Sequence, residues 1–180
     1  MMIRKGRICI RNAEEKDCQQ LAKWWNDGKV MAHAGFPLGL NTTAEEISRS
    51  ISTDSDDTRR RLIIEYDNDP IGEMSYRNLG ENRAEMGIKI CQQDHQNMGL
   101  GRIILSMLIS ELFARGYEKI VLDTNLKNTR AQHVYELLGF RKVRINENSW
   151  IDQLGVPQSS VDYELTPDSF VNYADKEERI

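Results

Sequence analysis

The apolar residues of this chain follow two periods, and the first is the alternation of a half-buried β-strand. Residues 84–91 show it most clearly, because every second residue is apolar. The set expected to face the core is Ala84, Met86, Ile88 and Ile90, and the opposite set is Glu85, Gly87, Lys89 and Cys91. Further strands are expected at 7–11, 62–66, 71–76, 119–123, 141–151 and 161–165.

The second period is helical. Residues 100–115 carry a broad apolar face formed by Ile103, Ile104, Met107, Leu108 and Leu112. A helix capped by Asn12 or Asp17 places Leu21, Trp24 and Trp25 on one face, and Gly28 is expected to end it. Thr43 with Glu46 forms a capping-box pattern for a helix to Ser52, and a last helix starts at Asn128 and ends at Gly139.

The order of these elements is a strand, two helices, three antiparallel strands, a helix, a strand, a helix and two strands. It predicts an α+β fold with a mixed, mostly antiparallel twisted sheet flanked by helices. We expect one domain over residues 1–168 and a C-terminal tail over 169–180. Residues 30–41 are interpreted as a loop, and the charged run 53–61 as a solvated loop.

Composition excludes several classes of protein. The chain has 24 basic and 28 acidic residues and a net charge of −4, which argues against a nucleic-acid-binding face. Its apolar runs are shorter than a membrane span, and residues 1–11 lack the apolar core of a secretory signal. Three cysteines without a CxxC pair favour a reduced, cytoplasmic setting. Three histidines show no metal-ligand spacing, so we predict no metal site.

The stretch Gln96-Asn97-Met98-Gly99-Leu100-Gly101 lies between the 84–91 strand and the 100–115 helix. A glycine-bearing turn there points several backbone N–H groups at one spot, where the helix dipole favours a phosphate. A P-loop is excluded because Arg102 and Ile103 follow Gly101, and a dinucleotide fingerprint lacks its third glycine at Ile104. An ordinary strand-to-helix turn is the structural alternative.

A second motif begins 27 residues after Gly101 and reads N-x-x-A-x-x-x-Y-x-x-x-G-F from Asn128 to Phe140. Together with Q-x-x-G-x-G, it resembles the GNAT superfamily of acyl-CoA-dependent N-acetyltransferases. The resemblance is specific over residues 84–140 and is closest to the branch of ribosomal-protein-alanine and small-amine acetyltransferases. It implies splayed central strands with the pantetheine arm of acetyl-CoA between them. Asn97 replaces a glycine that is common in the family loop, but asparagine tolerates unusual backbone angles.

Acyl transfer to an amine requires a proton acceptor, an oxyanion site and a proton donor for the thiolate. Asn128, Ala131 and Tyr135 share one helix face, and the resemblance places Tyr135 beside the sulfur as the acid. The alternative is that Tyr135 is a half-buried packing residue. Asn128 and Ala131 are expected to contact the pantetheine arm.

Backbone N–H groups complete the expected cofactor site. Those of Ile90 and Cys91 are the candidates for the oxyanion site. Those of Gln96, Asn97, Met98, Gly99, Leu100, Gly101 and Arg102 are expected to hold the pyrophosphate. The Arg102 side chain either adds a charged contact or points to solvent.

Glu85 is the candidate base, 11 residues before Gln96, the spacing of histone-type family members. A strand glutamate paired with a nearby cation is equally consistent with the pattern. Glu73 is a second candidate, and many family members use a chain of water molecules instead.

The resemblance implies that the first helices, the loop between them and the final hairpin line the acceptor side. These segments carry four aromatic residues: Trp24, Trp25, Phe36 and Trp150. Together, aromatic faces near carboxylates slightly favour a small cationic amine over a peptide N-terminus, although for each tryptophan alone core packing is the favoured interpretation. No cysteine is placed as an acyl carrier, so we expect direct attack in a ternary complex. The alternatives are a protein N-terminal acetyltransferase and a non-catalytic acyl-CoA-binding module, and a homodimer is compatible with either class.

Overall fold

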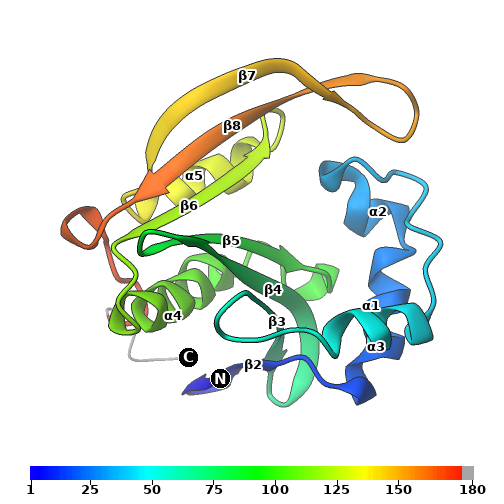
Figure 1. The fold of residues 1–180 in the computed structure, drawn as a ribbon, viewed down its shortest axis with the longest axis horizontal. Helices are drawn as coiled ribbons and strands as arrows, with labels where there is room; N and C mark the ends of the chain where they lie inside the picture. The colour runs from blue at the N-terminus through cyan, green and yellow to red at the C-terminus, as the bar shows by residue number, and fades with distance from the viewer. Residues whose placement is uncertain (176–180) are drawn as a thin grey trace.

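The strands of the computed structural model, which describes residues 1–175, form a single eight-stranded sheet in the order β1-β2-β3-β4-β5-β6-β8-β7 (Figure 1). Their bounds are Met2–Lys5 (β1), Ile8–Asn12 (β2), Arg59–Tyr66 (β3), Asp69–Gly80 (β4), Arg83–Ile90 (β5), Lys119–Asn125 (β6), Arg141–Ile151 (β7) and Pro157–Leu165 (β8). Neighbouring strands are antiparallel except β5 and β6, which are parallel. The predicted mixed, mostly antiparallel sheet is confirmed.

Helices cover both faces of this sheet. Their bounds are Cys18–Trp25 (α1), Gly28–Met31 (α2), Ala44–Ile51 (α3), Leu100–Ala114 (α4) and Thr129–Leu137 (α5), with 3₁₀ turns at Glu15–Asp17 (η1), Ala32–Ala34 (η2), Gln93–His95 (η3) and Pro167–Ser169 (η4). The capping box of Thr43 and Glu46 is confirmed. Gly28 does not end a helix as predicted, because α1 stops at Trp25 and Gly28 begins α2.

The parallel pair β5–β6 is short, and this gives the sheet a fork. Only Arg83–Glu85 of β5 pair with Lys119–Val121 of β6, although both strands continue further. Beyond Glu85 and Val121 the facing edges have no strand partner within residues 1–175, and Figure 1 shows the two strands diverging. The splay implied by the family resemblance is therefore present, and we call this region the strand fork.

Two hydrophobic cores hold the layers together. The larger one lies between the sheet and helices α4 and α5 and includes Ala84, Met86, Ile104 and Leu108. The smaller one lies on the opposite face under α1 and α3. Its buried members are Cys18, Leu21, Trp24, Ile47, Ile63 and Cys91. Burying apolar surface in these cores stabilises the fold, by about 25 cal/mol for each Å² removed from water.

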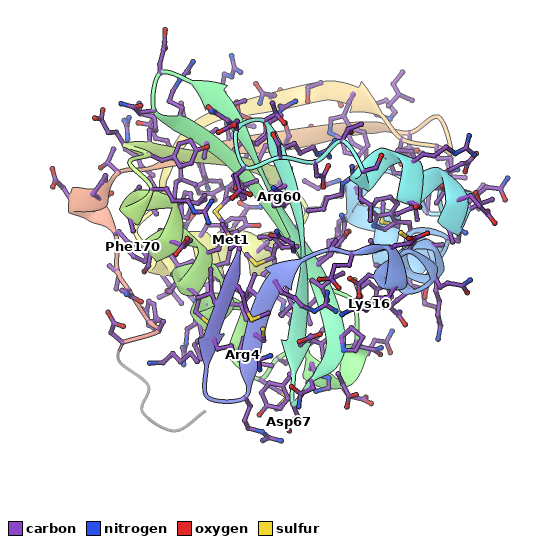
Figure 2. The ribbon with its side chains drawn as sticks, turned by 60° about the horizontal axis from the view of Figure 1, so that its bottom comes forward. Met1, Arg4, Lys16, Arg60, Asp67 and Phe170 are labelled. Carbon is purple, nitrogen blue, oxygen red and sulfur yellow. The ribbon has the colours of Figure 1, made fainter. Side chains whose placement is uncertain are left out.

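The N-terminal part of the sheet differs from the sequence expectations in two places. Residues 2–5 add the edge strand β1, which pairs with β2 to form the hairpin visible beside Arg4 in Figure 2. Residues 59–61 of the charged run belong to β3 instead of a solvated loop. The reason is an ion pair of 2.7 Å between Arg61 Nη2 and Asp54 Oδ1, whose side chains are 8% and 6% exposed. Pairing lets both charges lie inside the protein.

The chain after β8 returns to helix α4. Val171 N–H donates to Leu138 O, Tyr173 N–H donates to Ser106 Oγ, and the ring of Phe170 lies 5.7 Å from that of Phe113. Figure 2 shows Phe170 beside α4. The first seven residues of the predicted tail are thus packed on the domain, and residues 176–180 lie outside the described part. The domain boundary at residue 168 stays a prediction.

Candidate active site

The loop that joins β5 to α4 has the geometry of an anion site. Asn97 (φ +63°) and Gly99 (φ +76°) adopt left-handed angles, which turn successive amides towards one side. Gln96 fixes the loop, because its Nε2 donates to Ile90 O at 2.8 Å and its own N–H donates to Gln93 O. Within residues 1–175, no protein acceptor receives the N–H groups of Asn97, Met98 or Gly99. They lie at the N-terminus of the 15-residue helix α4, where the amides of the first helical turn point out of the helix and the helix dipole is positive.

Two arginines flank this loop. The guanidinium of Arg102 lies 5.2 Å from the ring centre of Tyr173. Arg130, in the first turn of α5, reaches Gln96 with its Nη1 at 3.5 Å from Oε1. The sequence analysis missed Arg130. A signal was available, because a cation in the first turn of a helix opposes the helix dipole and therefore suggests an anion nearby.

The backbone of β5 forms one edge of the strand fork. Cys91 N–H donates to Ile71 O at 2.8 Å, so this amide is already engaged in the β4 side of the sheet. Backbone groups alternate between the two edges of a strand, which turns those of Ile90 towards the fork. The Cys91 thiol is buried, and burial raises its pKa to about 12. Of the two expected oxyanion donors, Ile90 is the one whose amide faces the fork.

Helix α5 contributes the other predicted groups. Asn128 is its N-cap, with Oδ1 accepting from Ala131 N–H at 3.3 Å and Nδ2 lying 3.4 Å from Thr124 Oγ1. Tyr135 is 6% exposed, and its ring packs edge-on against Phe140 and Tyr163. Within residues 1–175 its hydroxyl forms no hydrogen bond. Burial, and then the charge of Asp123, raise the pKa of Tyr135 to about 12.

Both carboxylates proposed from the sequence are already paired. Glu85 Oε2 lies 2.8 Å from Arg77 Nη2, which agrees with the alternative that Glu85 is a strand glutamate paired with a nearby cation. Glu73 is 7% exposed and accepts hydrogen bonds from Trp25 Nε1 at 2.9 Å and Lys89 Nζ at 3.0 Å. Each therefore has a structural partner that would compete with a substrate ammonium group.

A third carboxylate, Asp123, was missed by the sequence analysis. It lies two residues beyond the last β5–β6 pair, and Asp162 of β8 faces it across the β6–β8 ladder. Within the described residues Asp123 forms no ion pair, whereas Asp162 binds Arg144 at 3.0 Å. The residue keeps contact with solvent, yet reduced hydration at the carboxyl group, and then the charges of Glu85 and Asp162, raise its pKa. An acidic residue ending the apolar run Ile120-Val121-Leu122 was the available signal.

The four aromatic residues do not form one cluster. Trp24 is 4% exposed and lies in the smaller core, which agrees with the alternative that it is a packing residue. The indole N–H of Trp25 instead donates to Glu73. Phe36 is 37% exposed in the loop after η2. Trp150 packs its ring on Gly35, where an added Cβ would come within 2.4 Å of Cζ3.

No group of three or more His, Cys, Asp or Glu side chains among residues 1–175 is arranged to hold a metal ion. Within the same range, no helix is both long and apolar enough to cross a membrane.

Comparison with known proteins agrees with this arrangement. The family model described as "Acetyltransferase (GNAT) domain" matches residues 7–141. The chain belongs to this GNAT family. The match runs from β2 to the first residue of β7, so it includes the strand fork, the loop at Gln96 and helix α5.

Among curated relatives, the [ribosomal protein bS18]-alanine N-acetyltransferases of Escherichia coli K12 and Salmonella typhimurium LT2 are each 42% identical over 55 residues. That segment is 31% of this chain and 37% of each relative, so the chain matches little more than a third of their length.

Solved structures share the fold across nearly the whole chain. Spermidine N-acetyltransferase from Vibrio cholerae, in complex with CoA and spermine, has a TM-score of 0.80 at 21% identity and covers 93% of this chain and 100% of its own. The ribosomal L7/L12 alpha-N-protein acetyltransferase RimL, in complex with coenzyme A, has a TM-score of 0.82 at 16% identity, with coverages of 94% and 99%. At these identities the likeness shows the fold alone.

Proposed function

We propose that this GNAT protein is an N-acetyltransferase that moves an acetyl group from acetyl-CoA to a primary amine. The observation that carries the proposal is the loop at the N-terminus of α4, where the N–H groups of residues 97–99 have no protein acceptor among residues 1–175, in a fold that also contains the strand fork and the buried Tyr135. An anion site and a fork between strands suit the pyrophosphate and the extended arm of one ligand. Relatives with acetyltransferase names and neighbours solved with coenzyme A support the same cosubstrate.

The residues present fit this ligand. The amides of residues 97–102 would hold the pyrophosphate, with Arg102 and Arg130 as flanking cations. A Cβ built on Gly101 meets only Ile90 Cδ1, at 3.9 Å, so the protein leaves space over the first turn of α4. Ile90 N–H would donate to the carbonyl oxygen as its negative charge develops.

The reaction is proposed as direct attack in a ternary complex. An alkylammonium must first lose a proton, and Asp123 is the carboxylate of the fork without an ion pair in the described structure. The amine nitrogen then bonds to the carbonyl carbon and the carbon–sulfur bond breaks. The nitrogen loses its second proton as the sulfur gains one, which balances the step. The buried, high-pKa Cys91 thiol is poorly suited to carry an acyl group.

Tyr135 is proposed to deliver the proton to sulfur as a relay. Its pKa of about 12 lies well above the value of about 8.5 for an ordinary thiol, so leaving a tyrosinate behind would cost about 5 kcal/mol. Tyr135 must therefore regain a proton in the same step in which it gives one to sulfur. The proton that the nitrogen loses as the amide forms can serve this purpose.

A small cationic amine is the proposed acceptor, slightly preferred over a peptide N-terminus. Asp123 gives the fork a carboxylate that forms no ion pair among residues 1–175, and Trp25 adds an aromatic ring beside Glu73. Such groups attract a compact ammonium ion by charge and cation–π contacts. The spermine-bound neighbour supports this choice, whereas the ribosomal-protein relatives favour a protein N-terminus.

A thiol-release assay with acetyl-CoA tests the function. The panel would contain spermidine, an aminoglycoside and short peptides with free N-termini, compared by kcat/KM. No thiol release with any acceptor of the panel, while acetyl-CoA still binds, would support the non-catalytic module instead. If kcat/KM is at least tenfold higher for the peptides than for the small amines, the protein is a protein N-terminal acetyltransferase instead.

A further inference from the structure

The tip of the β7–β8 hairpin is joined to the loop between η2 and α3 by a single glutamine. Gln153 N–H donates to Gly35 O, its side-chain Oε1 accepts from Leu38 N–H, and its Nε2 donates to Gly39 O, all at 2.9 Å. Trp150 adds its ring on Gly35. We call these contacts the Gln153 bridge. Glutamine suits it because one side-chain amide both donates and accepts.

The two partners of the bridge belong to opposite sides of the strand fork. The loop is anchored to the α1 side, since Leu40 N–H donates to Trp25 O and Asn26 exchanges two hydrogen bonds of 2.8 Å with Thr42. The hairpin extends from β8, which pairs with β6 on the other side of the fork. Figure 1 shows the hairpin tip on the same side of the molecule as α2.

The bridge therefore closes the polar face of the fork into a ring. At one end β5 and β6 are joined by their three paired residues, and at the other end the Gln153 bridge joins the two halves of the sheet. On the same side of the fork, the backbone of η2 also lies close to that of β6. A long acceptor laid across this face of the sheet would have to cross the bridge, while a short amine would not.

We propose that Gln153 is the specificity-determining residue of the acceptor site and restricts it to small amines. The proposal rests on the acetyltransferase function above and deepens it. Gln153 is not part of the chemistry, because it lies on the rim and binds only backbone groups of the opposite loop. Opening the bridge enlarges the entrance without altering the cofactor loop or Tyr135.

The hairpin tip is held by hydrogen bonds of its own, so a variant can weaken the bridge without unfolding the turn. Asp152 Oδ1 accepts from the N–H groups of Leu154 and Val156 at 2.9 Å, and its Oδ2 accepts from Gln158 Nε2 at 2.7 Å. Gly155 supplies the left-handed angle of the turn. Replacing Gln153 thus removes the two side-chain contacts to Leu38 and Gly39 and leaves the turn intact.

The test measures kcat/KM for spermidine and for a hexapeptide with a free N-terminus. Gln153→Ala is expected to raise the peptide-to-spermidine ratio at least tenfold, with the affinity for CoA unchanged. Gln153→Glu keeps the size but loses the donor to Gly39, so it should shift the ratio in the same direction. Leu154→Ala, at an exposed neighbouring position, is the matched control and should stay within twofold of wild type.

Gly35→Ala is an independent variant that keeps every group of Gln153. Its methyl group would collide with the Trp150 ring and push the hairpin away. Hydrogen exchange at residues 150–156 reports whether the bridge has opened. An open bridge with an unchanged ratio would overturn the proposal and leave the acetyltransferase function standing. So would a wild type that already prefers the peptide, whereas a wild type inactive on every amine would refute the function itself and the proposal with it.

Discussion

Replacing Tyr135 with phenylalanine should abolish most of the turnover without destabilising the protein. The residue is 6% exposed and its hydroxyl has no hydrogen-bond partner among residues 1–175, so its removal costs no protein hydrogen bond. The aromatic contacts with Phe140 and Tyr163, with ring centres 5.7 Å apart, remain. The melting temperature should therefore be unchanged or slightly raised.

The expected loss of turnover is about 100-fold, which corresponds to about 2.7 kcal/mol in the activation free energy. Thiol release under saturating acetyl-CoA and spermidine measures it, and calorimetry with CoA verifies that binding survives. Because the pKa of Tyr135 is about 12, the wild-type kcat profile should show no loss from its ionisation below about pH 11.

Tyr163→Phe is the matched control, because it removes a hydroxyl from the adjacent buried ring. Tyr163 OH donates to Glu136 Oε1 at 3.1 Å, so this variant should lose about 1 kcal/mol and melt about 2–4 °C lower. Its turnover should stay within twofold of wild type. If Tyr135→Phe keeps its turnover, or both variants lose it equally, the assignment of Tyr135 as the proton donor is refuted.

Three further predictions address other parts of the site and the fold. Asp123→Asn should lower turnover at least tenfold at pH 7 and less at pH 10, while stability holds or rises because facing like charges repel; a larger loss in Glu85→Gln would move the base to that residue. Gly101→Val should fold and raise the Kd for CoA at least tenfold in calorimetry, and an unchanged Kd would contradict the phosphate-loop assignment. The Arg115 guanidinium lowers the pKa of Asp56 to about 2, so this stabilisation is present above the unfolded pKa near 4 and lost as the pH falls towards 2. The stability gap between wild type and Asp56→Asn should shrink over that window, and a constant gap in chemical denaturation would disprove the pairing.

Several elements were predictable from the sequence because their cause is local. The Thr43–Glu46 capping box satisfies helix amides within four residues, and the turn after β3 is formed by Asp67 and Asn68, which both adopt left-handed angles. The strand-to-helix loop at Gln96 and the cap at Asn128 are likewise determined by neighbours in the chain. In each case a short stretch of sequence contains both the backbone groups or angles that need a particular residue and the residue that supplies it.

The remaining features depend on which distant segments pair, and the sequence could not supply them. Trp24 and Trp25 are adjacent, yet only the packing of α1 decides that one lies in the core and the other reaches Glu73. Asp123 is a candidate base only because of the strand pairing: β6 separates from β5 two residues earlier, and Asp123 lies opposite Asp162 of β8. Gln153 and Gly39 are more than a hundred positions apart, and only the tertiary fold brings their amide and carbonyl groups within hydrogen-bonding distance across the fork.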